Sequence, residues 1–422
     1  MKINICNSLY ICLLRYFYNH IVENQKKNNL QCTMKTEWVH KKLGDDDVAK
    51  IIMGQSPSSA SYNDENIGLP FLQGCADFGE VFPKTSVYCN EPLKVAPQNS
   101  ILMSVRAPVG TINKADQKYI IGRGLCSIVS LINNDYLYYY LLQNKNRLEQ
   151  KAQGSTFLAI NSAEVNDFDV SYPADLSTQR RIAAILASAD KVIAATQKTI
   201  AKYKQIKQGM MEDLLNEQCT MNNVQWKKVK LGECCTIHGR IGFRGYTTDD
   251  LVEKGYGAIT FSPSDIHNFK LCYDDCDYIT WKKYEESPEI KVFNGDILFC
   301  KTASIGKCAY VEGLKEKATI NPQFVVLKNF QCDSKFLFYK LISYGFQTQV
   351  QGITGGSTIK TMSQEKLSLE EITIPDLAAQ RRIATILSSI EAKIEAEEKV
   401  LQKYEKVKKG LMERLLEEDN DE

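Results

Sequence analysis

The residues with the clearest chemical potential lie in one short stretch, residues 238–246, which reads HGRIGFRGY. Its three glycines leave the backbone free to turn. Arg240 and Arg244 supply two guanidinium groups, and Phe243 and Tyr246 supply aromatic faces. Guanidinium forks pair with phosphate oxygens and with the O6 and N7 atoms of guanine. The stretch therefore predicts a nucleic-acid contact, or else a surface turn whose arginines form ordinary ion pairs.

The corresponding stretch in the first half of the chain, residues 53–63, reads MGQSPSSASYN and carries no charge. Its candidate contact residues are Gln55, Ser56 and Tyr62. A glutamine amide suits the edge of adenine, and a serine hydroxyl suits several bases. A solvated loop explains the same composition equally well. If both stretches contact bases, we expect them to contact different ones.

Two further pairs of segments follow matching landmarks in the two halves. Residues 104–110 (SVRAPVG) and 301–306 (KTASIG) each combine a cation with a tight turn after an expected strand. Residues 154–156 and 356–358 both read Gly-Ser-Thr and supply amide and hydroxyl donors. Such groups suit phosphate or base-edge contacts, although structural turns have the same composition. The candidate residues in these segments are Arg106, Lys301, Thr302, Gly154, Thr156, Ser357 and Thr358.

Catalytic motifs are scarce in this sequence. Residues 321–324 (NPQF) differ by one residue from the Asn-Pro-Pro-Phe motif of adenine methyltransferases, but no glycine-rich cofactor loop accompanies them. We interpret them as the entry to a strand. Residues 305–308 (IGKC) lack the first glycine and the hydroxyl residue of a phosphate-binding loop. The chain has four histidines and no Gly-x-Ser-x-Gly motif, so a hydrolase is not supported. We expect no catalytic residue, no cofactor and no metal.

The elements that must position the candidate residues are revealed by an internal repeat. Residues 175–217 align without a gap with residues 376–418, and about half of the positions are identical. Apolar residues recur in both copies at spacings of three, four and seven, which predicts long amphipathic helices of roughly 60 Å. Asp175 and Asp376 are the expected N-caps. We expect the two apolar stripes to pack on each other; the alternative is that each helix packs on its own domain.

The repeat divides the chain into two similar halves. Each half opens with a Trp…Leu-Gly motif, at Trp38 and Trp226, and ends in a long helix. Short β-branched and aromatic runs between these landmarks predict mixed α/β domains with mainly antiparallel sheets. Short helices are expected at residues 134–151 and 334–352. The expected segments are an extension over 1–33, domains over 34–174 and 218–375, and helices over 175–217 and 376–422.

Residues 1–33 have no counterpart in the second half. Their apolar stretch is interrupted by Arg15 and His20, which makes it too broken for a membrane span. We expect this extension to lie outside the fold, with Met34 as the working start, although a membrane or signal role is the alternative.

Composition limits the remaining possibilities. The chain has 422 residues, 44% of them hydrophobic and 24% charged, which suits two or three globular domains. A net charge of +1 means that any nucleic-acid contact must use local patches or partner subunits. Fourteen scattered cysteines without a Cys-x-x-Cys pair indicate free thiols in a reducing cytoplasm.

Over residues 34–418 this pattern resembles the specificity (S) subunit of type I restriction–modification systems. The resemblance rests on the two Trp…Leu-Gly openings, on two loops and on two helix starts. The loops are residues 54–57 (GQSP) and 239–242 (GRIG), and the helix starts are residues 179–182 and 380–383, both QRRI.

The resemblance implies two target-recognition domains held apart by an antiparallel pair of helices, with each domain reading half of a bipartite DNA site. It also implies that the helices dock two methyltransferase subunits, that motor–endonuclease subunits then join, and that catalysis belongs to these partners. The implied docking residues are Gln179, Arg180, Arg181, Gln380, Arg381 and Arg382. Two alternatives are a free-standing DNA methyltransferase and a coiled-coil scaffold without a DNA role. The scaffold leaves the Arg240–Arg244 loop unexplained.

Overall fold

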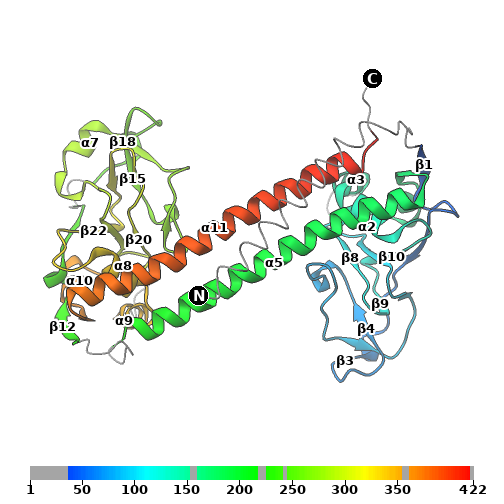
Figure 1. The fold of residues 1–422 in the computed structure, drawn as a ribbon, viewed down its shortest axis with the longest axis horizontal. Helices are drawn as coiled ribbons and strands as arrows, with labels where there is room; N and C mark the ends of the chain where they lie inside the picture. The colour runs from blue at the N-terminus through cyan, green and yellow to red at the C-terminus, as the bar shows by residue number, and fades with distance from the viewer. Residues whose placement is uncertain (1–36, 153–158, 217–224, 241–244, 354–360, 419–422) are drawn as a thin grey trace, which may run out of the picture. The chain divides into compact units, whose positions relative to one another are not determined.

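The computed structural model describes residues 37–152, 159–216, 225–240, 245–353 and 361–418. The chain divides into two compact units. Unit 1 contains the residues up to Ile193 and those from Lys403 onward, and unit 2 contains Ala194–Gln402. Each unit therefore holds one globular domain and a part of both long helices (Figure 1).

The two long helices are present as α5 (Leu176–Leu214) and α11 (Leu377–Leu415), each 39 residues long. Both expected N-caps are confirmed. The Asp175 carboxylate accepts a hydrogen bond from the Thr178 amide (2.9 Å), and the Asp376 carboxylate accepts one from the Ala379 amide (3.0 Å). The hydroxyls and amides of Ser177 and Thr178 hold the pKa of Asp175 below its usual range.

Within unit 2 the helices run antiparallel. Lys204 pairs with Glu398 (2.8 Å) and Lys207 with Glu391 (2.5 Å), so the residue number on α11 falls as that on α5 rises. Apolar residues from both helices enter one buried core. Those from α5 include Met211, and those from α11 include Ile383 and Leu387.

Within unit 1 the other parts of the same helices also pack together. Lys408 of α11 pairs with Asp190 of α5 (2.6 Å). Ile182 and Leu186 of α5 share a core with Met412 of α11 and with Leu416 just beyond it. The predicted packing of the two stripes on each other is therefore confirmed, because neither helix buries its stripe on its own domain alone.

The domain of unit 1 is built on a four-stranded antiparallel sheet in the order β2-β10-β7-β8. A second, five-stranded sheet has the order β3-β5-β4-β9-β6, and its β4 and β9 are parallel. Strands β1 and β11 form a separate antiparallel pair that leads into α5. The strands are β1 (Trp38–Lys42), β2 (Ala49–Met53), β3 (Tyr62–Asn63), β4 (Leu69–Leu72), β5 (Tyr88–Cys89), β6 (Val95–Ala96), β7 (Ile101–Ser104), β8 (Ile112–Lys114), β9 (Tyr119–Ile121), β10 (Leu125–Ser130) and β11 (Asp169–Pro173).

The domain of unit 2 repeats this plan. Its main antiparallel sheet has the order β13-β22-β19-β20, and its second sheet, β14-β18-β15-β21, again contains one parallel pair, β15 with β21. Strands β12 and β23 form the pair that leads into α11. The strands are β12 (Lys227–Lys230), β13 (Thr236–Gly239), β14 (Leu251–Val252), β15 (Gly257–Phe261), β16 (Ile266–His267), β17 (Lys270–Leu271), β18 (Tyr278–Thr280), β19 (Ile297–Cys300), β20 (Cys308–Tyr310), β21 (Ala318–Ile320), β22 (Phe324–Lys328) and β23 (Glu371–Ile374).

The shared plan means that the duplication extends from sequence to topology. The fold is mixed α/β, with two mainly antiparallel sheet domains and two long helices packed together, as the sequence predicts. The shorter helices are α2 (Asn134–Gln143), α3 (Lys145–Lys151) and α4 (Ser162–Asn166) in unit 1. In unit 2 they are α6 (Leu231–Cys234), α7 (Trp281–Glu285), α8 (Ser334–Ile342), α9 (Tyr344–Ile353) and α10 (Gln364–Leu369).

Each predicted short helix is in fact two helices. Residues 134–151 divide at Asn144, and residues 334–352 divide at Ser343. Both break residues have polar side chains that bond back to the preceding turn, with Asn144 donating to the Tyr140 carbonyl (2.9 Å) and Ser343 donating to the Lys340 carbonyl (2.7 Å). Such local bonds compete with helix continuation, and apolar periodicity alone does not reveal them.

No helix in the described part of the chain is long and apolar enough to cross a membrane.

Candidate nucleic-acid interface

The described parts of several loops selected from the sequence lie at one edge of the main sheet in each unit, together with the turn that precedes the central strand. In unit 1, β10 lies between β2 and β7 and is antiparallel to both. The start of β10 is therefore beside the ends of β2 and β7. We call this the loop edge, which in unit 1 comprises residues 54–56, 105–106 and 122–124.

Backbone hydrogen bonds tie the three segments of the unit 1 loop edge together. The Gly54 amide donates to the Leu125 carbonyl (2.9 Å), and the Gln55 amide donates to the Ile121 carbonyl (2.9 Å). The Val105 amide donates to the Gly124 carbonyl (2.9 Å). A side chain on Gly54 would not fit, because its Cβ would come within 2.1 Å of the Gly122 carbonyl oxygen. The loop edge is therefore a fixed platform.

The candidate side chains of unit 1 differ in their exposure to solvent. Gln55 and Arg106 are exposed. Tyr62 is half-buried: its ring stacks on Phe71 with 4.7 Å between the ring centres, and its hydroxyl donates to the Pro57 carbonyl (3.0 Å). Gln55 and Arg106 can thus reach an external ligand, whereas Tyr62 mainly fixes the loop.

The loop edge of unit 2 comprises residues 239–240, 301–302 and 321–323. Here β22 lies between β13 and β19, and the Lys301 amide donates to the Gln323 carbonyl (2.8 Å). Lys301 is half-buried, and burial lowers the pKa of its amine. Thr302 is also half-buried and forms a β-bridge with Thr361. Both residues therefore lie at the loop edge of unit 2, directly after β19.

Arg240 occupies an unexpected position. Its side chain is 4% exposed, and burial lowers the pKa of its guanidinium. Its Nε donates to the Ile320 carbonyl (3.2 Å), its NH2 group donates to the Thr319 hydroxyl (3.3 Å), and its charge lies 5.3 Å from the centre of the Tyr246 ring. Tyr246 is itself packed against a small core around Ala258. In this structure Arg240 therefore points into the domain, and Tyr246 is half-buried beside it.

Five candidate residues lie outside the described part of the chain. They are Gly154, Thr156, Arg244, Ser357 and Thr358.

The helix-start residues separate into two groups. Gln179 and Gln380 are buried, at 2% and 3% exposed. The Gln179 amide group accepts from the Asn133 amide (2.9 Å) and donates to the Pro173 carbonyl (2.7 Å), and Gln380 makes the matching bonds with Asp333 (2.8 Å) and Pro375 (2.8 Å). These glutamines join each long helix to its own domain. The adjacent arginines, by contrast, are exposed: Arg180, Arg181, Arg381 and Arg382.

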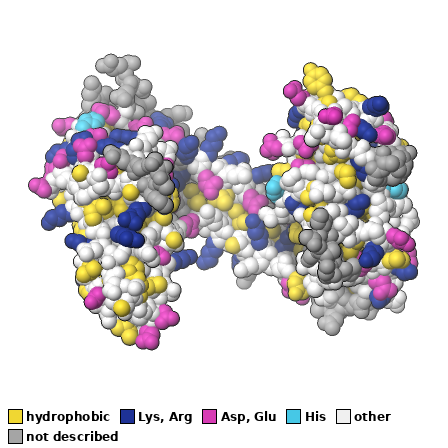
Figure 2. All heavy atoms as spheres, turned by 180° about the vertical axis from the view of Figure 1, so that it is seen from behind, with side chains coloured by type: hydrophobic (Ala, Val, Ile, Leu, Met, Phe, Trp, Pro, Cys, Tyr) yellow, Lys and Arg dark blue, Asp and Glu magenta, His cyan; other side chains and the backbone are white. Residues whose placement is uncertain are grey.

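Charge is mixed over the surface. Figure 2 shows Lys and Arg side chains interspersed with Asp and Glu on the visible face of each unit. No group of three or more His, Cys, Asp or Glu residues among those described is arranged to hold a metal ion.

The model of the type I restriction modification DNA specificity domain matches this chain twice, over residues 35–205 and 223–406. The chain belongs to the type I restriction–modification specificity family. The two matches include both loop edges and the starts of both long helices, and they cover most of the described chain.

Similar proteins agree with this assignment. A putative type I restriction enzyme MjaX specificity subunit of Methanocaldococcus jannaschii is 41% identical over 182 residues, which is 42% of this chain and 43% of that protein. That match thus covers less than half of the relative.

Two solved structures share the fold of this specificity-family chain. The S subunit of a type I restriction–modification system from M. genitalium has a TM-score of 0.59 at 16% identity, covering 92% of this chain and 98% of that one. A chain from a study of complex assembly and conformational transition of the type I system has a TM-score of 0.58 at 15% identity, covering 92% and 100%.

Sequence reasoning missed a pair of polar clusters in this specificity-family fold. In unit 2 the Tyr339 hydroxyl donates to Glu391 (2.5 Å), which also pairs with Lys207 (2.5 Å). In unit 1, Tyr139 donates to Asp190 (2.6 Å), which pairs with Lys408 (2.6 Å). We call each set a clamp. The repeat offers a signal for them, because the offset of 201 residues carries Lys207 onto Lys408 and Asp190 onto Glu391.

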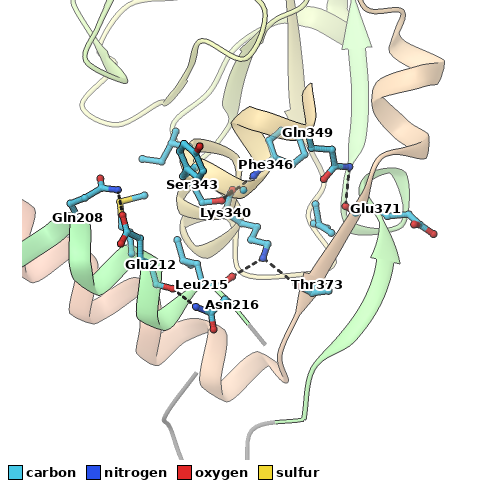
Figure 3. A pocket seen from close by; sticks show the side chains of 15 residues that line it. Gln208, Glu212, Leu215, Asn216, Lys340, Ser343, Phe346, Gln349, Glu371 and Thr373 are labelled. Carbon is cyan, nitrogen blue, oxygen red and sulfur yellow. Dashed lines mark hydrogen bonds between the residues drawn. The ribbon is translucent and has the colours of Figure 1, made fainter. Parts of the chain in front are cut away.

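A cavity of about 680 Å³ lies in unit 2 beside the end of α5 (Figure 3). Its lining includes Met211, Phe346 and Lys340. The Lys340 amine donates to the Leu215 carbonyl (2.7 Å) and to the Thr373 hydroxyl (3.1 Å). These bonds connect α8 to the end of α5 and to β23. We therefore assign the Lys340 amine a structural role in the cavity.

Proposed function

We propose that this chain is the DNA-reading subunit of a type I restriction–modification complex and that it recognises an asymmetric, bipartite double-stranded DNA site. The domain over residues 34–174 reads one half-site, and the domain over residues 218–375 reads the other. A duplex presents the same groove face about every 34 Å, so the half-sites lie roughly one helical turn apart.

The observation that carries this proposal is the pair of loop edges. Both units build the same platform from the same three loops, but the side chains differ. Unit 1 offers Gln55 and Arg106, and unit 2 offers Lys301 and Thr302. A shared frame with different contents supports two readers with different preferences, because base identity is read by side-chain donors and acceptors in the groove.

We infer that the long helices dock two methyltransferase subunits, and that motor–endonuclease subunits join this assembly in the cytoplasm. The repeated, exposed arginine pairs at the two helix starts support two equivalent docking sites. One of the similar solved structures comes from work on assembly of the type I system, which is consistent with this role. Gln179 and Gln380 act differently: they position the helices through buried hydrogen bonds.

The proposal assigns methyl transfer, ATP hydrolysis and DNA cleavage to the partner subunits, so the chain itself needs no cofactor. Purified chain is expected to show none of these activities. Turnover in any of these assays that follows the chain through successive purification steps would contradict the subunit role, and methyl transfer would support a free-standing methyltransferase.

The proposal is tested by a genome-wide map of DNA methylation. A host without its own adenine methylation expresses the chain together with its methyltransferase partner gene, and a matched host expresses the partner gene alone. The expected result is one asymmetric, two-part methylated sequence that appears only with the chain. A continuous or palindromic site, or the same methylation without the chain, would contradict the two-reader model.

Docking is tested with charge reversals in the same host. Arg180→Glu combined with Arg381→Glu is expected to abolish methylation while the chain remains folded. Lys191→Glu combined with Lys393→Glu is the matched control, because both lysines are exposed on the same helices away from their starts. Unchanged methylation in the arginine double variant, or equal loss in both double variants, would contradict docking at the helix starts.

A further inference from the structure

Arg123 is an exposed arginine at the tip of a tight turn in unit 1. It lies between Gly122 and Gly124, and the turn is closed by a hydrogen bond from the Leu125 amide to the Gly122 carbonyl (3.0 Å). The turn immediately precedes β10, the strand between β2 and β7. Arg123 therefore emerges at the centre of the loop edge, between Gln55 on one side and Arg106 on the other.

The backbone under Arg123 is held on several sides. Its own amide donates to the Ser56 hydroxyl (3.2 Å), and the Gly122 amide donates to the Leu72 carbonyl (2.7 Å). Both glycines are packed against the end of β4. A Cβ on Gly124 would come within 2.8 Å of the Gln73 carbonyl oxygen, and one on Gly122 within 3.2 Å of the same atom. The backbone of Arg123 is therefore held in place, while its exposed side chain extends away from the turn.

Within the described part of unit 1, no residue forms an ion pair or a side-chain hydrogen bond with the guanidinium of Arg123. Its charge opposes the rise that burial causes in the pKa of Tyr62, so the two side chains are within electrostatic range. Arg123 thus differs from Arg240, which is buried and bonded within unit 2.

We propose that Arg123 is a specificity-determining residue that reads the O6 and N7 atoms of a guanine in the half-site recognised by unit 1. This inference rests on the proposed function, because it names the chemistry of one of the two readers. A guanidinium fork matches that edge bidentately. The central position favours a base over a phosphate, because groups that contact the backbone flank the groove whereas groups that read bases enter it.

The same position in unit 2 has different chemistry. The turn before β22 is Asn321-Pro322-Gln323, so the place of Arg123 is taken by Pro322, which has no polar side chain. The Asn321 side chain is 8% exposed and bonds with Gln323. The two loop edges therefore differ at their centres, and the guanine preference is expected in only one half-site.

The test uses the full chain and selection of bound duplexes from a randomised DNA library, with the methyltransferase partner co-expressed. Arg123→Ala and Arg123→Lys are compared with the unchanged chain and with Lys118→Ala. Lys118 is the matched control, because it is an exposed cation of the same unit at the opposite end of β9. In Arg123→Ala, preference for one guanine in one half-site should fall about tenfold to a hundredfold, with the other positions unchanged. Arg123→Lys should keep part of that preference, because a lysine amine also donates to the guanine edge. Lys118→Ala should leave the recognised sequence unchanged.

The remaining outcomes separate this inference from the proposed function. An unchanged chain that selects no two-part sequence would overturn the proposed function itself. A clear two-part sequence that is the same with and without Arg123 would overturn only the inference. Uniform weakening on all sequences in Arg123→Ala, restored in Arg123→Lys, would identify a phosphate contact and would also overturn it. Because Arg123 is exposed, thermal melting of the variants should match the unchanged chain, which excludes unfolding as the cause.

Discussion

Arg240 carries a positive charge inside the domain of unit 2, where its hydrogen bonds to Ile320 and Thr319 join the end of β13 to β21. Arg240→Ala would leave the buried Ile320 carbonyl and Thr319 hydroxyl without this donor. We expect unfolding of unit 2 to become easier by about 1–3 kcal/mol. Hydrogen exchange of the β13 and β21 amides measures this effect. Arg123→Ala is the control, since loss of an exposed arginine should change stability by less than about 0.5 kcal/mol.

Equal exchange in the Arg240 and Arg123 variants would show that the buried guanidinium contributes nothing to unit 2. If Arg240→Ala also alters DNA recognition, the change should appear in the half-site of unit 2 only, because the residue acts by holding its own loop edge.

The type of a loop residue could be predicted from the sequence, but whether its side chain is buried or exposed could not. The sequence identifies Arg240 and Lys301 as cations in loops, and both do lie at the loop edge. Whether a cation faces solvent depends on strands distant in sequence, such as β21 for Arg240, and no local pattern encodes that packing. Arg123 was overlooked because its turn is short and has no other charged residue. Its position at the centre of the unit 1 loop edge follows only from the order of the strands.

At the scale of the elements, the two clamps couple each domain to both long helices. Tyr339 is on α8, Glu391 on α11 and Lys207 on α5. Burial, followed by the charge of Glu391, raises the pKa of Tyr339, so the phenol remains a donor at neutral pH. Tyr339→Phe removes a hydrogen bond to a charged group and should destabilise unit 2 by about 1.5–3 kcal/mol. Denaturant unfolding followed by hydrogen exchange in α8 measures the change.

The matching variant in unit 1 is Tyr139→Phe, which should have an effect of similar size in α2. Lys204→Ala provides the control, because the Lys204–Glu398 pair is largely exposed and should contribute less than about 1 kcal/mol. If loss of the Tyr339 hydroxyl costs no more than loss of Lys204, the clamp does not couple domain to helices.

Packing between α5 and α11 is tested by placing charges on the buried face of α11. Ile390 and Ile394 of α11 are 7% and 6% exposed. Replacing both with Asp buries carboxylates in an apolar contact, which should cost about 3 kcal/mol or more. Thermal melting should fall sharply, and assembly with methyltransferase subunits should be lost. Val407→Asp is the matched control on the same helix, because Val407 is 57% exposed and its replacement should leave melting unchanged.

The long helices were predictable in detail because their signals are local. Apolar spacing and the caps at Asp175 and Asp376 lie within the helical segments themselves. The breaks at Asn144 and Ser343 were missed because each depends on a side chain that bonds its own backbone. The clamps were missed because they combine three elements far apart in the sequence, although the repeat offset links their residues.

At the scale of the whole molecule, duplication supplies one frame, and divergence of the loop edges supplies the two readers that we propose. The strand order of the main sheet, the parallel pair in the second sheet and the buried glutamine at each helix start are the same in both units. The side chains of the loop edges differ, as do the outer strands: unit 1 adds β6 to its second sheet, and unit 2 adds the β16–β17 pair. Such a division predicts that recognition is modular: one domain can change its preference without altering the other domain.

The prediction is tested by exchanging residues 34–174 for the first domain of another member of the specificity family, with the junctions placed before β1 and after β11. These junctions leave α5 and its buried Gln179 intact, so the helix pair and the proposed docking surface are retained. The methylated sequence should change in one half-site and keep the other half-site and the gap between them. The reciprocal exchange of residues 218–375 should change only the other half. A swap that alters both halves together, while the hybrid remains folded and active, would show that the two loop edges read DNA as a single surface.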